Sequence, residues 1–120
     1  MTIEDKPRAG VLPHSEAHRL ADVLEVVPGS VVSRTLLRRD LGNITLYSFD
    51  TGEGLSEHTA PFDAFIQVVA GAVELTIGGE PVAAKAGDVV VMPADVPHAV
   101  LATEPLKMLL VMIRNAAPQA

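Results

Sequence analysis

Short runs of alternating apolar and polar residues follow one another from Val31 onward, and turn residues separate them at intervals of about ten positions. A period of two is typical of strands that bury one face, and no helical period interrupts the series. We therefore predict an all-β domain, built as a sandwich or a barrel. The expected strands are residues 31–37, 43–50, 64–69, 73–77, 82–85, 89–92, 98–102 and 106–114.

Two of these runs carry further information. The clean alternation over residues 73–77 is followed by Gly78 and Gly79, which both accept positive φ, so a two-residue hairpin turn is predicted there. The last run is apolar on both faces from Met108 to Ile113. It is therefore expected to be buried within the chain or covered by a second subunit.

Residues 1–30 follow a different pattern. Apolar positions three or four apart, with Ser15 as a candidate cap and Pro28 as a stop, predict one short helix. We divide the chain into an N-terminal arm with this helix, residues 1–30, and a barrel domain, residues 31–120, which together form a single domain. The apolar helix positions are Ala17, Leu20 and Leu24.

Composition limits the chemistry. The chain has 120 residues and no cysteine, so thiolate chemistry is excluded and His, Asp and Glu remain as the strong metal ligands. A net charge of −6 and few aromatic rings argue against a nucleic-acid partner. The longest uncharged apolar run is far shorter than a membrane helix, and the N-terminus does not resemble a secretory signal. We therefore expect no membrane partner, no nucleotide cofactor and a cytoplasmic location.

The four histidines differ in their surroundings. His14 and His18 are four residues apart on the expected helix, a spacing that can bind a metal. A helical pair alone supplies only two ligands, so two solvated surface histidines are the favoured interpretation.

His58 and His98 each lie within a framework of glycine, proline and alanine. The first is Gly52, five residues, His58, one residue, Ala60, three residues, Ala64, six residues, Gly71. The second is Gly87, five residues, Pro93, one residue, Asp95, two residues, His98, three residues, Ala102. Together these spacings resemble the two sequence motifs of the cupin superfamily. The resemblance covers roughly residues 31–114 and implies a small antiparallel jelly-roll β-barrel of the conserved-barrel type.

The resemblance also implies a metal site that lacks part of its ligand set. In metal-binding cupins the first motif supplies two histidines and a glutamate, and the second motif supplies a third histidine. His58 and His98 match two of these positions, whereas Ala60 and Ala64 replace the others. Asp95 stands where the family often has glycine, which bears on the turn before His98.

No convincing third ligand emerges from the sequence. On a continuous strand Glu57 and Asp63 have the opposite parity from His58, so they point away unless a bulge near Pro61 reverses the phase. The remaining candidates are Glu53, in the preceding loop, and Gln67, which would coordinate weakly.

The same parity argument defines a candidate substrate pocket. Ala60 and Ala64 share the parity of His58, so their methyl groups enlarge and dry the cavity beside it. Phe62 has the same parity, and it either covers a ligand or packs in the core. An inward-facing arginine, at Arg34 or Arg114, would suit a carboxylate ligand, although exposed strand arginines are the commoner case.

Three classes of function remain open. In the first, a metal-dependent enzyme such as a dioxygenase, isomerase or decarboxylase holds its ion on His58 and His98. The second is a metal-free enzyme with a histidine general base, and the third is a binding or sensing module for a small molecule. A bound ion would be a divalent transition metal that suits imidazole (Ni, Zn, Fe, Mn or Cu), completed by water or ligand. Without an ion, the two histidines are neutral residues that line the cavity. Small cupins commonly pair, so a homodimer is expected.

Overall fold

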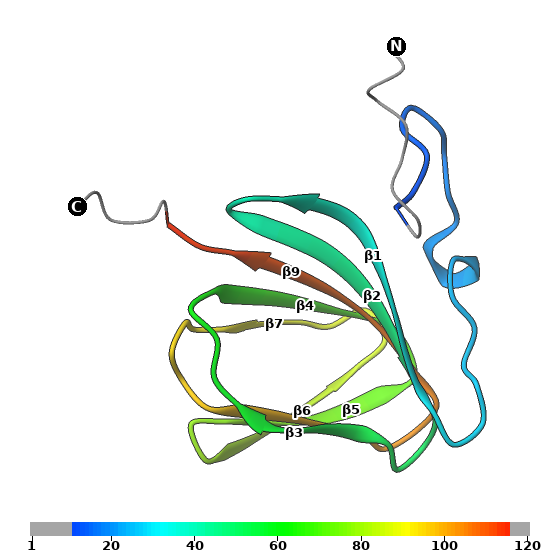
Figure 1. Ribbon diagram of the computed structural model, residues 1–120. Helices are drawn as coiled ribbons and strands as arrows, with labels where there is room; N and C mark the ends of the chain where they lie inside the picture. Colours follow the sequence, from blue (N-terminus) through cyan, green and yellow to red (C-terminus); the bar gives the residue numbers. More distant parts are fainter. Residues whose placement is uncertain (1–10, 116–120) are drawn as a thin grey trace.

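Nine strands form two antiparallel sheets that face each other across an apolar core in residues 11–115, the part of the chain that this computed structural model describes (Figure 1). The larger sheet has the order β1-β2-β9-β4-β7, and the smaller has the order β3-β8-β5-β6. This arrangement confirms the predicted all-β jelly-roll barrel. The strands are β1 (Val31–Arg39), β2 (Gly42–Phe49), β3 (Gly54–His58), β4 (Asp63–Ala70), β5 (Ala72–Ile77), β6 (Glu80–Lys85), β7 (Val89–Met92), β8 (His98–Ala102) and β9 (Leu106–Ile113).

Alternation along each strand explains which side chains fill the core. In β9, Leu106, Met108 and Leu110 are buried, and the residues between them are only partly covered. β9 lies between β2 and β4, so the run that is apolar on both faces occupies the centre of the larger sheet. A central strand of this kind tolerates apolar residues at successive positions because both of its faces can be covered.

All eight predicted strands are present, with their ends within two residues of the expected positions. The Gly78-Gly79 turn is also confirmed, because both residues have positive φ (57° and 84°) and Ile77 pairs with Glu80 across it. The strand missed was β3, whose sequence Gly-Leu-Ser-Glu-His has one apolar residue. β3 is at an edge of the smaller sheet, and most of its residues are exposed, so burial imposes no alternation on it.

The predicted N-terminal helix is wrong in its extent. Within residues 11–115 the helical structure is a single 3₁₀ turn, Leu20–Asp22, and Ser15 lies in a turn with φ of 62° rather than capping a helix. The arm is instead held by the barrel: the Ser48 hydroxyl donates to the Glu25 carbonyl (2.8 Å) and Lys107 Nζ donates to the Ala21 carbonyl. These bonds to the outer face of the larger sheet replace bonds that a helix would make within itself. Residues 1–10 and 116–120, which the expected arm and barrel domain include, lie outside the described part of the chain.

None of the helical structure within residues 11–115 has the length and hydropathy that crossing a membrane requires.

Candidate functional site

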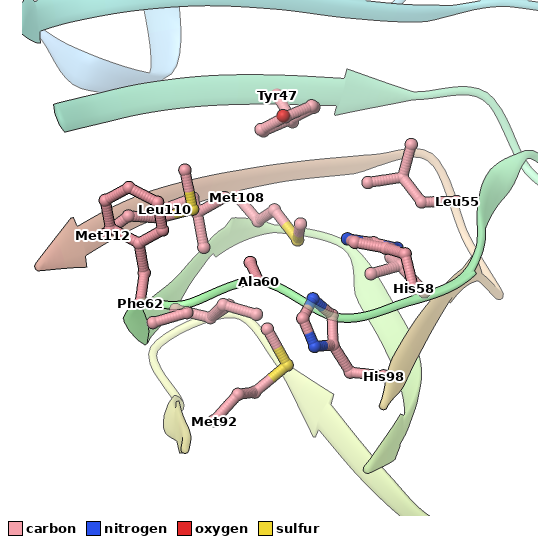
Figure 2. Close-up of a pocket in the computed structure, with 13 residues that line it drawn as sticks. Tyr47, Leu55, His58, Ala60, Phe62, Met92, His98, Met108, Leu110 and Met112 are labelled. Atoms are coloured by element: carbon pink, nitrogen blue, oxygen red, sulfur yellow. The ribbon is translucent and has the colours of Figure 1, made fainter. Parts of the chain in front are cut away.

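A cavity of about 190 Å³ lies between the two sheets and contains His58 and His98 (Figure 2). Its wall is otherwise mostly aliphatic, thioether and aromatic. Figure 2 shows Phe62 and Met112 at one end of the cavity and His58 and Leu55 toward the other. The lining residues are Tyr47, Leu55, His58, Ala60, Phe62, Ala64, Ile66, Met92, His98, Val100, Met108, Leu110 and Met112.

Strand pairing brings the two histidines together. His58 ends β3 and His98 begins β8, and the two residues are direct partners in this antiparallel pair. Their ring centroids are 4.3 Å apart, with an angle of 66° between the ring planes. His98 is buried, whereas His58 is exposed at the strand end. The pair therefore lies where the cavity meets the protein surface, with His98 on the inner side and His58 on the outer side.

The two imidazoles make the same kind of contact with the backbone. His58 Nδ1 lies 2.7 Å from the carbonyl oxygen of Ser56, and His98 Nδ1 lies 3.2 Å from that of Val96. A carbonyl only accepts, so in the neutral ring the proton belongs on Nδ1, and Nε2 carries the lone pair. No described residue forms a hydrogen bond to either Nε2. Each ring thus presents a nitrogen that is able to bind an ion or a donor group.

The turn before His98 is fixed from two sides. Asp95 has φ of 63°, a left-handed conformation that suits glycine, the residue that the motif resemblance implies at this position. Its N–H donates to the Ala60 carbonyl (2.9 Å), and the Ala94 N–H donates to Asp63 Oδ1 (2.9 Å). These bonds tie the β7–β8 connection to the β3–β4 connection and to the first residue of β4. They hold the two histidine-bearing strands in a fixed relation at one end of the barrel.

The three predicted pocket residues, Ala60, Phe62 and Ala64, all line this cavity. The reasoning from a single continuous strand was nevertheless wrong. His58 ends β3 in the smaller sheet, and Ala64 belongs to β4 in the larger sheet, so the chain between them crosses from one sheet to the other. They meet because the two sheets enclose the same space.

No acidic residue from the described part of the chain, residues 11–115, lines the cavity. The Asp63 carboxylate accepts a hydrogen bond from the Ala94 N–H, and Glu57 is exposed on an edge strand. Glu53 and Gln67 do not line the cavity. In the described residues, no group of three or more His, Asp or Glu side chains is placed to hold a metal. The protein therefore offers two imidazoles, which fit part of the coordination of an ion that prefers nitrogen donors.

The other candidates lie elsewhere. His14 and His18 are exposed on the arm, where His18 Nε2 lies 3.1 Å from the Pro13 carbonyl oxygen. Arg34 Nη1 donates to the Val23 carbonyl (3.3 Å), so it joins β1 to the arm rather than entering the cavity. Arg114 follows β9, and its guanidinium carbon lies 5.6 Å from the centroid of the Phe62 ring.

Sequence reasoning missed the methionines. Met92, Met108 and Met112, three of the four in the chain, line the cavity with the histidines. Figure 2 shows the sulfur atoms of Met92 and Met108 on the side of the cavity where the two imidazoles lie. The alternation along β9 could have identified two of them, because Met108 and Met112 lie on the face of the strand that also carries the buried Leu106 and Leu110. Met92 ends β7, where parity alone does not identify the cavity.

Comparison with known proteins assigns the family. The sequence profile described as "Cupin domain" matches residues 45–112. A conserved protein of unknown function from Streptococcus pyogenes is 34% identical, with a TM-score of 0.84, over 88% of this chain and 93% of that one. A cupin superfamily protein from Desulfitobacterium hafniense is 28% identical, with a TM-score of 0.81, over 87% and 95% of the two chains.

A cupin 2 conserved barrel domain protein from Leptotrichia buccalis is 40% identical, with a TM-score of 0.77, over 79% of this chain and 46% of that one. This chain thus spans less than half of that protein. Among curated proteins the sequence has no match. The profile match over more than half of the sequence, together with the shared barrel, shows that the chain belongs to the cupin superfamily.

Proposed function

We propose that the barrel binds a transition metal ion through Nε2 of His58 and of His98, and that a small molecule completes the coordination of this ion. The observation that carries the proposal is the matched anchoring of the two rings. Each Nδ1 contacts a backbone carbonyl two residues earlier, which leaves both Nε2 atoms as acceptors in one cavity. A hydrogen bond from the other ring nitrogen to a carbonyl commonly fixes the tautomer and orientation of a ligating histidine.

The other donors in the cavity bear on which ion binds. Imidazole suits Ni, Zn, Fe, Mn and Cu to different degrees, and divalent affinities rise toward copper. Thioethers are soft ligands, and the cavity wall contains those of Met92, Met108 and Met112. We therefore expect copper to bind most tightly of the five metals. Calcium is disfavoured because it requires many oxygen donors.

A metal-free role for the cavity is the second candidate. It is favoured by the apolar wall and by Ala60 and Ala64, which line the cavity at positions where the resemblance to metal-binding cupins implies ligands. In this case the cavity holds a compact apolar molecule, and the two histidines supply its few polar contacts. Calorimetric titration with one small apolar molecule, carried out on metal-depleted protein and on protein loaded with Cu²⁺, separates the two candidates. Binding that requires Cu²⁺ supports the metal site, and equal binding in both samples supports the metal-free role.

The proposal names a binding function and no reaction. A histidine that acts as a general base is usually oriented by a carboxylate, and no acidic side chain of residues 11–115 lines the cavity. An enzymatic role, as a dioxygenase, isomerase or decarboxylase, would depend on groups that the bound ion and the substrate bring.

Elemental analysis tests the proposal. Protein is purified without a histidine tag or chelator, and the double variant His58→Ala, His98→Ala is compared with the double variant His14→Ala, His18→Ala. We expect about one equivalent of transition metal per chain in the wild type and in the arm control, and none in the cavity variant. Circular dichroism checks that both variants are folded.

Wild-type protein that stays free of metal after exposure to Cu²⁺, Ni²⁺, Zn²⁺, Fe²⁺ and Mn²⁺ contradicts the proposal. Equal metal content in the two double variants contradicts it as well, because it places the ion away from the cavity. Unfolding of the cavity variant is examined with the single variant His58→Ala, since His58 is exposed and its removal leaves the buried core in place.

A further inference from the structure

A second hollow, of about 440 Å³, lies at the turn between β1 and β2. It shares one residue with the cavity that contains the histidines, because the ring of Phe62 lines both spaces. Phe62 stands at the end of the cavity away from His58 (Figure 2). The residues that line this hollow, called the arginine hollow below, are Arg38, Arg39, Asp40, Gly42, Asn43 and Phe62.

Positive charge exceeds negative charge in the arginine hollow. Two basic residues, Arg38 and Arg39, line it together with a single acidic residue, Asp40. Arg39 Nη1 donates to the Arg38 carbonyl (2.7 Å), which leaves other N–H groups of this guanidinium for a ligand. A third guanidinium is at its border: Arg114 Nη2 donates to the Asp40 carbonyl (3.3 Å), and the same side chain lies over Phe62. The ion pairs found within residues 11–115 involve other residues, Arg19 with Asp22 and Lys107 with Glu25. The three arginines therefore make no ion pair with any described residue.

This concentration of positive charge contrasts with the rest of the chain. The protein carries a net charge of −6, so a local group of arginines opposes its overall field. Asp63, which is next to Phe62 in the chain, is already a hydrogen-bond acceptor for the Ala94 N–H. The single negative charge of Asp40 thus faces the three positive charges of the arginines.

The residues that line the arginine hollow and the histidine cavity together indicate the kind of molecule that would bind to both. The arginine hollow offers guanidinium groups, which bind a carboxylate through paired hydrogen bonds. Behind Phe62 the cavity wall is apolar, with the two imidazoles as its nitrogen donors. A molecule with an anionic group at one end and an apolar body suits the chemistry of both spaces, which Phe62 borders.

We propose that the arginine hollow binds the carboxylate of a small organic acid whose apolar body lies past Phe62 in the cavity. The proposal rests on the proposed small-molecule role of the cavity and adds the chemical class of the ligand. A carboxylate is preferred over a phosphate monoester because the doubly charged phosphate loses more hydration when it binds beside an apolar cavity.

Hexanoate and its neutral analogue hexanamide test the proposal, because they share an alkyl chain and differ in charge. Binding of each to full-length protein is measured by calorimetric titration at low ionic strength, where exposed charges are least screened. We expect hexanoate to bind about tenfold more tightly than hexanamide, which corresponds to one favourable charged contact. Hexyl phosphate is the third probe, and we expect it to bind more weakly than hexanoate.

Variants locate the charge that is responsible. In the double variant Arg38→Gln, Arg39→Gln we expect the preference for hexanoate to fall to about twofold or less, with the affinity for hexanamide unchanged. The control is the double variant Arg19→Gln, Lys85→Gln, which removes the same charge from exposed positions outside both spaces. It should keep the full preference.

Equal binding of hexanoate and hexanamide overturns the proposal, as does a preference that survives in the Arg38, Arg39 variant or the absence of binding for both probes. Tighter binding of hexyl phosphate overturns the choice of a carboxylate. A parallel metal titration keeps the two proposals distinct. If the preference for hexanoate is lost while His58 and His98 still bind metal, only the proposed ligand class is contradicted. If the preference is kept while no metal binds, only the proposed metal site is contradicted.

Discussion

The hydrogen bonds at Nδ1 of His58 and His98 decide what the cavity can bind. If Nε2 were bonded to the protein instead, the lone pair would lie on Nδ1, and each ring would offer a ligand the nitrogen beside its Cβ rather than the one at its tip. The observed contacts, to Ser56 and Val96, place the backbone carbonyls on the opposite side of each ring from Nε2. The sequence motif identified these two residues but contained no information on ring orientation, which depends on the local path of β3 and of the turn before β8.

Gly71 shows how a single residue supports the barrel. It has φ of 82°, and a Cβ at this position would overlap the carbonyl oxygen of Pro105 in the connection that leads to β9. We expect Gly71→Ala to lower the free energy of unfolding by about 2–4 kcal/mol, because backbone strain and a steric conflict combine. Urea denaturation measures the change.

The matched control is Gly79→Ala. Gly79 also has positive φ (84°), but a Cβ there would meet nothing within 4 Å. We expect it to cost only the backbone strain, about 1 kcal/mol. Equal losses in the two variants would show that the close approach to Pro105 does not matter.

Among the elements, the strands were predictable because burial imposes alternation on them, and the exceptions have physical causes. β3 escaped detection because an exposed edge strand needs no apolar face. The N-terminal segment had the spacing of a helix, yet its backbone and side chains bond to the barrel instead. Tertiary contacts of this kind cannot be seen in a local pattern. The crossing between sheets after His58 was hidden for the same reason.

The attachment of the arm to the larger sheet gives a prediction for Ser48. This residue is fully buried, and its hydroxyl donates to the Glu25 carbonyl at 2.8 Å. We expect Ser48→Ala to lower the free energy of unfolding by about 1 kcal/mol and to raise amide exchange in residues 19–26, because the carbonyl loses its donor. Hydrogen exchange read by mass spectrometry measures the second effect.

Ser33→Ala is the control for this variant, since Ser33 is exposed on β1. We expect it to leave stability and exchange nearly unchanged. An arm that exchanges equally fast in wild type and Ser48→Ala would mean that this hydrogen bond does not hold it.

At the scale of the whole molecule, the family and the barrel followed from the two motifs, whereas the homodimer stays a prediction. The outer face of the larger sheet offers a surface on which to test it. Phe65 pairs with Val91 on one side and with Val111 on the other, and Phe65 and Val91 are 38% and 62% exposed. β7 is also an edge strand, and exposed apolar edges favour pairing with another chain.

We expect wild-type protein to sediment as a dimer and Val91→Lys to sediment as a monomer at micromolar concentration, because a buried lysine at this edge would lose its hydration. Leu101→Lys is the control, since Leu101 is exposed on β8 in the other sheet. A monomeric wild type would remove the homodimer prediction. Dissociation by Leu101→Lys alone would move the interface to the smaller sheet.

A long-range ¹H–¹⁵N NMR spectrum of the histidine side chains, recorded before and after one equivalent of Zn²⁺ as a diamagnetic probe, shows whether His58 and His98 form one site. We expect neutral His58 and His98 to carry their proton on Nδ1, and both Nε2 resonances to move together at one equivalent of the ion. The resonances of His14 and His18, on the arm, should stay in place. A proton on Nε2 in either cavity histidine, or a metal shift confined to one of the two rings, would contradict the claim that they form one site.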